Sequence, residues 1–221
     1  MRRGTIFGWI LFAFGMFAAG LFIAASMNRL PSVLIDEPDL GIEACPRDEA
    51  AENALLRKSA ERLENLHPSV RQGAEDLIRL SKSCYDIDIR ITQGYRTKKE
   101  QDELFSQGRS KSGEIVTNAR GGESMHNYGL AFDFVLLKPD GGITYDLNHD
   151  GNGSGKNDWN EIGMLGKALG FDWGGDWTRF KDVPHFEMTF GHSLNDLKKG
   201  KRPAESLIAD RTDEIEELLG K

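Results

Sequence analysis

Hydrophobic residues mark three short stretches of the chain as strands. Residues 87–92 have isoleucine at every second position, and Gly94 ends this stretch. The segment 184–190 alternates between polar and apolar residues in the same way. A period of two is typical of a half-buried strand. Residues 131–137 are apolar apart from Asp133, so they predict a more deeply buried strand that carries one carboxylate.

Four other segments have the apolar spacing or the start signals of helices. Thr97 stands three residues before Glu100, which is the arrangement of a capping box. Strands and helices that mix without regular alternation are typical of an α+β fold. We therefore expect a small, mainly antiparallel sheet with helices packed on one side, the helices being 49–66, 68–82, 97–107 and 158–169.

The apolar segment 5–26 is long enough to cross a membrane. It is uncharged, and 22 residues of helix span roughly 33 Å, about the depth of a bilayer core. Ala24-Ala25-Ser26 leave open a cleavable signal peptide, whose apolar part is typically only about 7–15 residues long. We expect an uncleaved N-terminal transmembrane helix to be part of the fold.

The charges near this segment predict its orientation and exclude one class of partner. Arg2 and Arg3 precede the apolar segment and only Arg29 follows closely, which favours a cytoplasmic N-terminus. The rest of the chain is then periplasmic or extracellular. The formal net charge of −7 argues against nucleic acid as a partner, because phosphates need a basic surface.

The chain has two cysteines, Cys45 and Cys84. An exported location permits a disulfide between them. Two free thiols, with Cys84 packed as a small apolar side chain, are the alternative. Neither cysteine has a neighbour at metal-binding spacing, so neither is a zinc ligand.

Two histidines and one aspartate form a possible zinc site. Catalytic zinc takes three protein ligands from His, Asp and Glu, and leaves a fourth position for water. His126 precedes the strand that carries Asp133, and Gly129 permits a tight turn between them. His185 stands at the start of the alternating segment 184–190. The alternative for Asp133 is a buried aspartate held by a salt bridge or hydrogen bonds.

These residues lie in two motifs that resemble a known family. Residues 124–133 read S-x-H-x-x-G-x-A-x-D, and residues 182–187 read D-x-P-H-F-E. Together they resemble the LAS-type zinc metallopeptidases, the D-Ala-D-Ala carboxypeptidase and L-alanyl-D-glutamate endopeptidase family (peptidase M15). The resemblance covers about residues 65–191, and further stretches of it fit the endolysin-like branch: 94–97, 100–101, 107–109 and 174–177.

The resemblance implies a role for each matching residue. His126, Asp133 and His185 would bind Zn²⁺, and Asp182 would act as the general base. Arg96 would steady the scissile carbonyl oxygen or a substrate carboxylate, and Ser124 would order the site by hydrogen bonding. Outside the family context, Arg96 reads as a surface salt-bridge residue and Asp182 as a turn aspartate.

A second metal site is suggested by the sequence after residue 145. Asp146, Asn148, Asp150 and Asn152 follow the D-x-N-x-D-G start of a calcium loop. The twelfth position, where such a loop has a bidentate glutamate, is Asn157. A weak Ca²⁺ site and a solvated Gly/Asn turn both fit this pattern.

The family resemblance implies an enzyme tethered beside the cell wall. We expect a zinc peptidase that hydrolyses peptidoglycan stem peptides at the L-alanyl-D-glutamate bond, with a membrane partner through residues 5–26. The alternatives are a D-Ala-D-Ala carboxypeptidase and a non-catalytic cell-wall-binding module. The expected segments are a cytoplasmic stub (1–4), the anchor (5–26), a spacer (27–48), the zinc peptidase domain (49–193) and a charged C-terminal tail (194–221).

Overall fold

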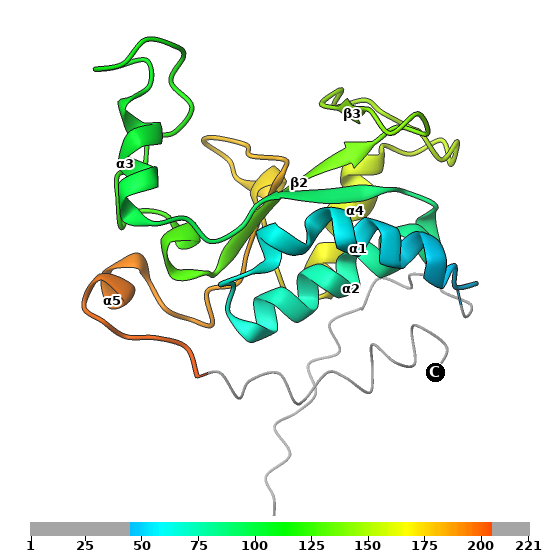
Figure 1. Cartoon of the computed structure of the whole chain (residues 1–221), viewed down its shortest axis with the longest axis horizontal. Coiled ribbons are helices and arrows are strands. Elements are labelled where there is room, and N and C mark those ends of the chain that lie inside the picture. The colour runs from blue at the N-terminus through cyan, green and yellow to red at the C-terminus, as the bar shows by residue number, and fades with distance from the viewer. Residues whose placement is uncertain (1–44, 205–221) are drawn as a thin grey trace, which may run out of the picture. The chain divides into compact units, whose positions relative to one another are not determined.

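A computed structural model describes residues 45–204 of the chain, and Figure 1 shows how its helices and strands are arranged. The elements in chain order are α1 (Glu49–Leu63), α2 (Pro68–Tyr85), β1 (Ile89–Gln93), α3 (Lys98–Ser106), η1 (Met125–Tyr128), β2 (Ala131–Leu137), β3 (Ile143–Thr144), α4 (Asp158–Ala168), β4 (Asp172–Trp173), η2 (Gly174–Asp176), β5 (His185–Glu187) and α5 (Leu194–Lys198).

The strands form one antiparallel sheet in the order β1-β2-β5-β4, and β3 pairs with β2 at its far end. The neighbours β2 and β5 are 48 residues apart in sequence, since one ends at Leu137 and the other begins at His185. The α+β class with an antiparallel sheet is therefore as expected. The strand predicted over 184–190 is shorter, because the ladder with β4 and β2 ends at Glu187.

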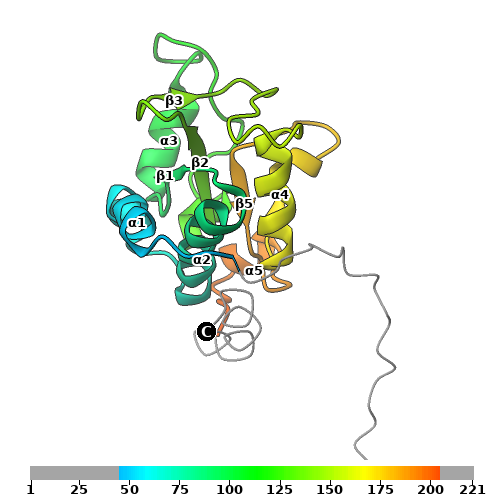
Figure 2. The same ribbon diagram turned by 90° about the vertical axis from the view of Figure 1, so that its right-hand side faces the viewer.

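The sheet has one face covered by helices. Phe132 of β2 and Phe186 of β5 pair across the strands and are fully buried. A side chain at Gly166 of α4 would meet the ring of Phe186, so α4 packs directly on this face. Helix α2 contacts both α1 and α4, and Figure 2 shows it between them. The helices bury the phenylalanine face, and the opposite face carries Asp133 and His185.

The expectation of a transmembrane helix in this fold needs correction. Among residues 45–204, no helix is both long enough and apolar enough to cross a membrane. The segment expected to do so, 5–26, lies outside the described residues. The architecture given by the structure is therefore the α+β domain alone.

Part of the expected C-terminal tail packs on this domain. Helix α5 begins with a capping box formed by Ser193 and Asp196, and Leu197 is buried in the core. Lys198 forms a 3.1 Å ion pair with Glu123 in the loop before η1. These contacts attach the start of the tail to the domain, and residues 205–221 lie outside the described part of the chain.

Candidate metal centre and active site

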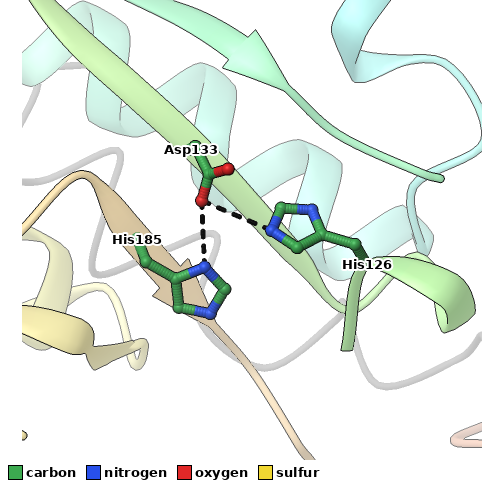
Figure 3. A group of neighbouring side chains, drawn as sticks. All are labelled: His126, Asp133 and His185. Atoms are coloured by element: carbon green, nitrogen blue, oxygen red, sulfur yellow. Dashed lines mark hydrogen bonds and ion pairs between the residues drawn. The ribbon is translucent and has the colours of Figure 1, made fainter. Parts of the chain in front are cut away.

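The antiparallel pairing of β2 and β5 brings Asp133 and His185 together. The two residues are direct partners in the ladder, so their side chains leave the sheet on the same face. The distance from His185 Nδ1 to Asp133 Oδ1 is 2.9 Å. Figure 3 shows both imidazoles of the site turned toward this carboxylate oxygen. Residues 52 positions apart in the chain thus meet at one point.

His126 reaches the same point from the short helix η1. Gly129 ends η1 in the left-handed conformation, with φ of 70°, and its N–H donates to the carbonyl oxygen of His126. His126 Nδ1 lies 2.7 Å from the carbonyl oxygen of Gly94. Because a carbonyl oxygen can only accept, Nδ1 carries a proton, so Nε2 is the nitrogen that faces the site, and a metal ion would displace any proton bound there. Nε2 lies 3.3 Å from Asp133 Oδ1.

The three side chains form a group that could hold a metal ion. One ligand atom from each of His126, Asp133 and His185 lies within 4.8 Å of the other two. Ligand atoms bound to one tetrahedral zinc, each about 2.0–2.2 Å from it, are about 3.3 Å apart. The nitrogen and oxygen donors are those that Zn²⁺ prefers, so the donor set fits this ion.

The charges around Asp133 hold it in the ionised form. Burial alone would raise the pKa of Asp133, but the charges of and hydrogen bonds from His126 and His185 hold that pKa well below its usual range. Burial lowers the pKa of His185, yet hydrogen bonds to Asp133 and Glu187 raise it to about 9. A metal ion and a proton therefore compete for the Nδ1 atom of His185.

Arg96 enters the site at the junction between β1 and α3. Its backbone N–H donates to the carbonyl oxygen of His126 at 3.0 Å, which couples it to η1. Its Nη2 atom lies 3.9 Å from Asp133 Oδ2. Burial lowers the pKa of Arg96, and its buried Nε has no hydrogen-bond partner among the described residues. The guanidinium thus has an unpaired donor beside the metal group, and its role in binding a substrate oxygen stays a prediction.

Gln101 supports Arg96, a role that the sequence did not suggest. Arg96 Nη1 donates to Gln101 Oε1 at 2.7 Å. The amide of Gln101 donates in turn to the carbonyl oxygen of Ala119 at 2.8 Å and to Thr117 Oγ1 at 3.3 Å. Gln101 is 1% exposed. From the sequence, a glutamine in the polar helix 97–107 is expected to be exposed. Only the packing of the loop around Thr117 shows that Gln101 is buried.

Asp182 lies in the turn between η2 and β5. Its N–H donates to the carbonyl oxygen of Gly174, and its own carbonyl oxygen accepts from the N–H of His185, both at 3.0 Å. Burial raises the pKa of Asp182, and the negative charge of Asp133 raises it further. The charges of His126 and His185 lower the pKa of the same carboxyl. Asp182 therefore interacts electrostatically with all three residues of the metal group.

Ser124 stands immediately before η1. Its carbonyl oxygen accepts from the N–H of Asn127 at 3.0 Å, but its hydroxyl does not cap the helix. The backbone of Ser124 therefore helps to form the turn that carries His126. An ordering role for its hydroxyl stays a prediction.

A pocket is lined by two residues that contact His185. The rings of Trp177 and His185 have centroids 5.1 Å apart. Trp177 and Glu187 help to line a pocket of about 530 Å³, together with Lys167, Gly170, Phe171, Asp172, Trp173 and Asp176. Aromatic and charged groups therefore line this pocket, and Trp177 and Glu187 connect it to His185 of the metal group.

A Gly94→Ala substitution is expected to damage the site and the fold together. A β-carbon at Gly94 would lie 1.8 Å from the backbone carbonyl oxygen of Arg62, so α1 or β1 must move. That movement would also displace the carbonyl group that holds His126. We expect a loss of about 1–3 kcal/mol in the free energy of unfolding, measured by urea denaturation, with weaker zinc binding.

Gly142→Ala is the matched control for this substitution. A β-carbon there meets only the flexible side chain of Asp140, at 3.0 Å. Its stability and zinc affinity should stay near wild type. Equal stability of the Gly94→Ala variant and the wild type would contradict the predicted clash.

The structure does not support the calcium site suggested for the loop 146–157. Asp146 Oδ1 accepts from the N–H of Asn148, and Asp150 Oδ2 accepts from the N–H of Gly155, both at 3.0 Å. The Nδ2 atom of Asn152 donates to the carbonyl oxygen of Tyr85. The two aspartates stabilise turns of the loop itself, and Asn152 attaches the loop to the end of α2. Within residues 45–204, the acids and histidines that lie close enough together to hold a metal ion are His126, Asp133 and His185, and the loop contributes none of them. Calcium is therefore not supported, and the solvated turn is the better description.

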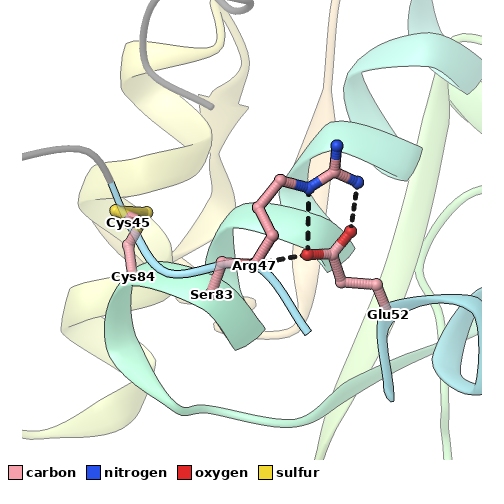
Figure 4. The surroundings of a disulfide bond; sticks show 5 residues. All are labelled: Cys45, Arg47, Glu52, Ser83 and Cys84. Atoms are coloured by element: carbon pink, nitrogen blue, oxygen red, sulfur yellow. Dashed lines mark hydrogen bonds and ion pairs between the residues drawn. A yellow bond between two sulfur atoms is a disulfide. The ribbon is translucent and has the colours of Figure 1, made fainter. Parts of the chain in front are cut away.

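The structure contains the disulfide between Cys45 and Cys84, shown in Figure 4. An ion pair lies beside it, with Arg47 Nη2 2.7 Å from Glu52 Oε2. Glu52 is 1% exposed, and its other oxygen accepts from Ser83 Oγ at 2.6 Å. The bridge and this buried network fasten the start of the described chain to α1 and α2.

Replacing Cys84 with serine is expected to destabilise the domain by about 2–4 kcal/mol. The bridge joins residues 39 positions apart, and a loop of this length restricts the unfolded chain substantially. Urea denaturation without reductant measures the change. Cys45→Ser should have the same effect, and the double variant no further effect, because all three remove one bond. Additive losses would contradict this explanation.

The chain is similar in sequence to known cell-wall peptidases. A family model described as D-alanyl-D-alanine carboxypeptidase matches residues 117–188. The chain is 58% identical over 124 residues to the peptidoglycan L-alanyl-D-glutamate endopeptidase CwlK of Bacillus subtilis (strain 168). The aligned region covers 56% of this chain and 74% of that protein. It is 29% identical over 150 residues to the L-alanyl-D-glutamate peptidase of Listeria phage A118, covering 67% of this chain and 47% of that protein.

A solved structure is similar as well. The crystal structure of the Serratia marcescens L-Ala D-Glu endopeptidase ChiX matches 60% of this chain and 87% of that chain, with 22% sequence identity and a TM-score of 0.41.

Proposed function

Because the chain belongs to the peptidase M15 family, we propose that it is a zinc-dependent endopeptidase that cuts the L-alanyl-D-glutamate bond of peptidoglycan stem peptides. The observation that carries this proposal is the meeting of His126, Asp133 and His185 beside Arg96 and Asp182. The bond specificity rests on the relative that is 58% identical and is named for that activity.

Zn²⁺ would be held by His126 Nε2, the Asp133 carboxylate and His185 Nδ1. These atoms face one another, and the other nitrogen of each imidazole has a hydrogen-bond partner. The ion, when bound, supplies a Lewis acid that polarises the peptide carbonyl and acidifies water.

Asp182 accepts a proton from the attacking water in this proposal. The raised pKa of its carboxyl makes it a stronger base than an exposed aspartate, and it lies in the field of the metal group. After attack, the same carboxyl can pass the proton to the departing amine.

Arg96 binds the oxygen on which negative charge develops. Its Nε and Nη atoms are permanently charged donors, and Gln101 holds one side of the guanidinium. Arg96 Nη2 lies 3.9 Å from Asp133 Oδ2, so the positive charge of the guanidinium also partly offsets the negative charge of this carboxylate.

The domain acts outside the cytoplasm in this proposal. The Cys45–Cys84 disulfide supports it, since such bonds persist in oxidising compartments. The substrate supports it too, because peptidoglycan lies beyond the cytoplasmic membrane.

Digestion of defined muropeptides tests the proposed bond. We expect mass spectrometry to show a product that begins with D-glutamate, with cleavage lost on chelation and restored by Zn²⁺. Release of terminal D-alanine would instead establish a D,D-carboxypeptidase, the activity named by the family model that matches residues 117–188. Stoichiometric zinc without cleavage of any stem peptide would establish a non-catalytic wall-binding module.

A further inference from the structure

His185 has an acidic partner on each of its two ring nitrogens. Nδ1 lies 2.9 Å from Asp133 Oδ1, within the metal group, and Nε2 lies 3.1 Å from Glu187 Oε2, outside it. A neutral imidazole carries one proton, so the nitrogen that binds a metal and the nitrogen that donates a hydrogen bond must differ. Since Nδ1 faces Asp133 and His126, the proton belongs on Nε2, where Glu187 accepts it.

The backbone of Glu187 fixes its position beside this ring. It follows His185 by two positions in β5, so both side chains leave the same face of the strand. Its backbone lies inside the sheet, opposite Ala131 of β2 and Asp172 of β4. The ring that it contacts is also confined, because the ring of Trp177 packs 5.1 Å from it, centroid to centroid.

We propose that Glu187 is a positioning residue that holds His185 in the tautomer with the proton on Nε2 and so presents Nδ1 to the metal ion. This inference rests on the proposed zinc function. A carboxylate acceptor also makes the opposite nitrogen a stronger donor to the metal. Without it, the ring can turn or take the other tautomer, and zinc affinity falls even though all three ligands remain.

Zinc affinity at a fixed pH tests the inference without relying on catalysis. The full chain is stripped of metal, and its dissociation constant for Zn²⁺ is measured by competition with a chromogenic chelator. We expect Glu187→Ala to bind zinc about 10–100-fold more weakly than wild type. Glu187→Gln keeps an acceptor oxygen at the same place, so its affinity should be much closer to wild type than to Glu187→Ala.

Two further measurements separate positioning from other effects. Asp172→Ala removes an exposed carboxylate opposite Glu187 on β4, and its zinc affinity should match wild type if the hydrogen bond matters more than nearby charge. The absorption spectrum of the Co²⁺-substituted protein should change in Glu187→Ala and stay as in wild type in Glu187→Gln. Thermal unfolding of each metal-free variant checks that the fold is intact.

The outcomes are distinct. Unchanged zinc affinity and an unchanged Co²⁺ spectrum in Glu187→Ala would overturn the inference while leaving the proposed function standing. Equal weakening in Glu187→Gln and Glu187→Ala would also overturn it, since charge or direct ligation would then be the cause. Failure of the wild type to bind zinc would refute the proposed metal site itself, and the inference with it.

Discussion

An Asp182→Ala variant is expected to bind zinc with wild-type stoichiometry and to lose about 10²–10⁴-fold in kcat/KM on a stem peptide. The three side chains that could hold the metal do not include Asp182, so the metal should stay in place. What disappears is the carboxylate that accepts the proton from water. Hydrolysis rates at saturating zinc, with the metal content of the same samples, measure both effects.

An exposed acidic residue outside the site provides the control for this substitution. Glu61 lies in α1 and forms an exposed 3.8 Å ion pair with Arg62, a kind of pair that contributes little to stability. Glu61→Ala should keep nearly full activity. A wild-type rate in Asp182→Ala would refute the role of this residue as base.

The pH dependence of the wild type should agree with this role. A general base works in its ionised form, and the ionised fraction falls as the pH drops through the pKa of the group. Burial and the charge of Asp133 raise the pKa of Asp182, so activity should be lost on acidification at a pH above the ordinary pKa of an aspartate. Zinc occupancy must be measured at each pH, because protons also compete for His185.

A His126→Ala variant is expected to lose zinc and activity together. Zinc binding by a complete ligand set contributes about 10–16 kcal/mol, so one of three ligands accounts for about 3–5 kcal/mol, or roughly a 10²–10⁴-fold loss of affinity. The buried imidazole also holds its hydrogen bond to Gly94, so the apo fold should lose some stability as well. Zinc dissociation constants and peptide hydrolysis on the same preparation measure the result.

His149 offers a matched control for the loss of an imidazole. It lies in the loop 146–157, with its Nε2 3.8 Å from Asp158 and no part in the metal group. His149→Ala should bind zinc as the wild type does. If it weakened zinc binding as much as His126→Ala, the assignment of the ligands would be wrong.

Local rules predicted much of the secondary structure. The capping box of Thr97 and Glu100 is present in both directions, and helices begin at Glu49, Pro68 and Asp158 as the patterns indicated. These features depend on residues within one or two turns of each other, so the sequence contains the necessary information. Residue types and their spacing likewise singled out His126, Asp133 and His185.

Long-range pairing could not be read in the same way. The sequence did not reveal that β5 lies between β2 and β4, nor that Asp133 faces His185 across a ladder. It also led to two interpretations that the structure does not support. The half-matching calcium motif stabilises its own turns, and the expected transmembrane helix has no counterpart in residues 45–204.

The sequence by itself indicated the family of this protein and its candidate site residues, because the two motifs that resemble the family are local properties of the chain. Only the tertiary structure decided which nitrogen of each histidine faces the metal group. That choice depends on the Gly94 carbonyl and the Glu187 carboxylate. The support that Gln101 gives to Arg96 is likewise visible only in the folded chain. Such partners come from packing between distant segments, and a hydrogen bond between them exists only once the sheet has formed.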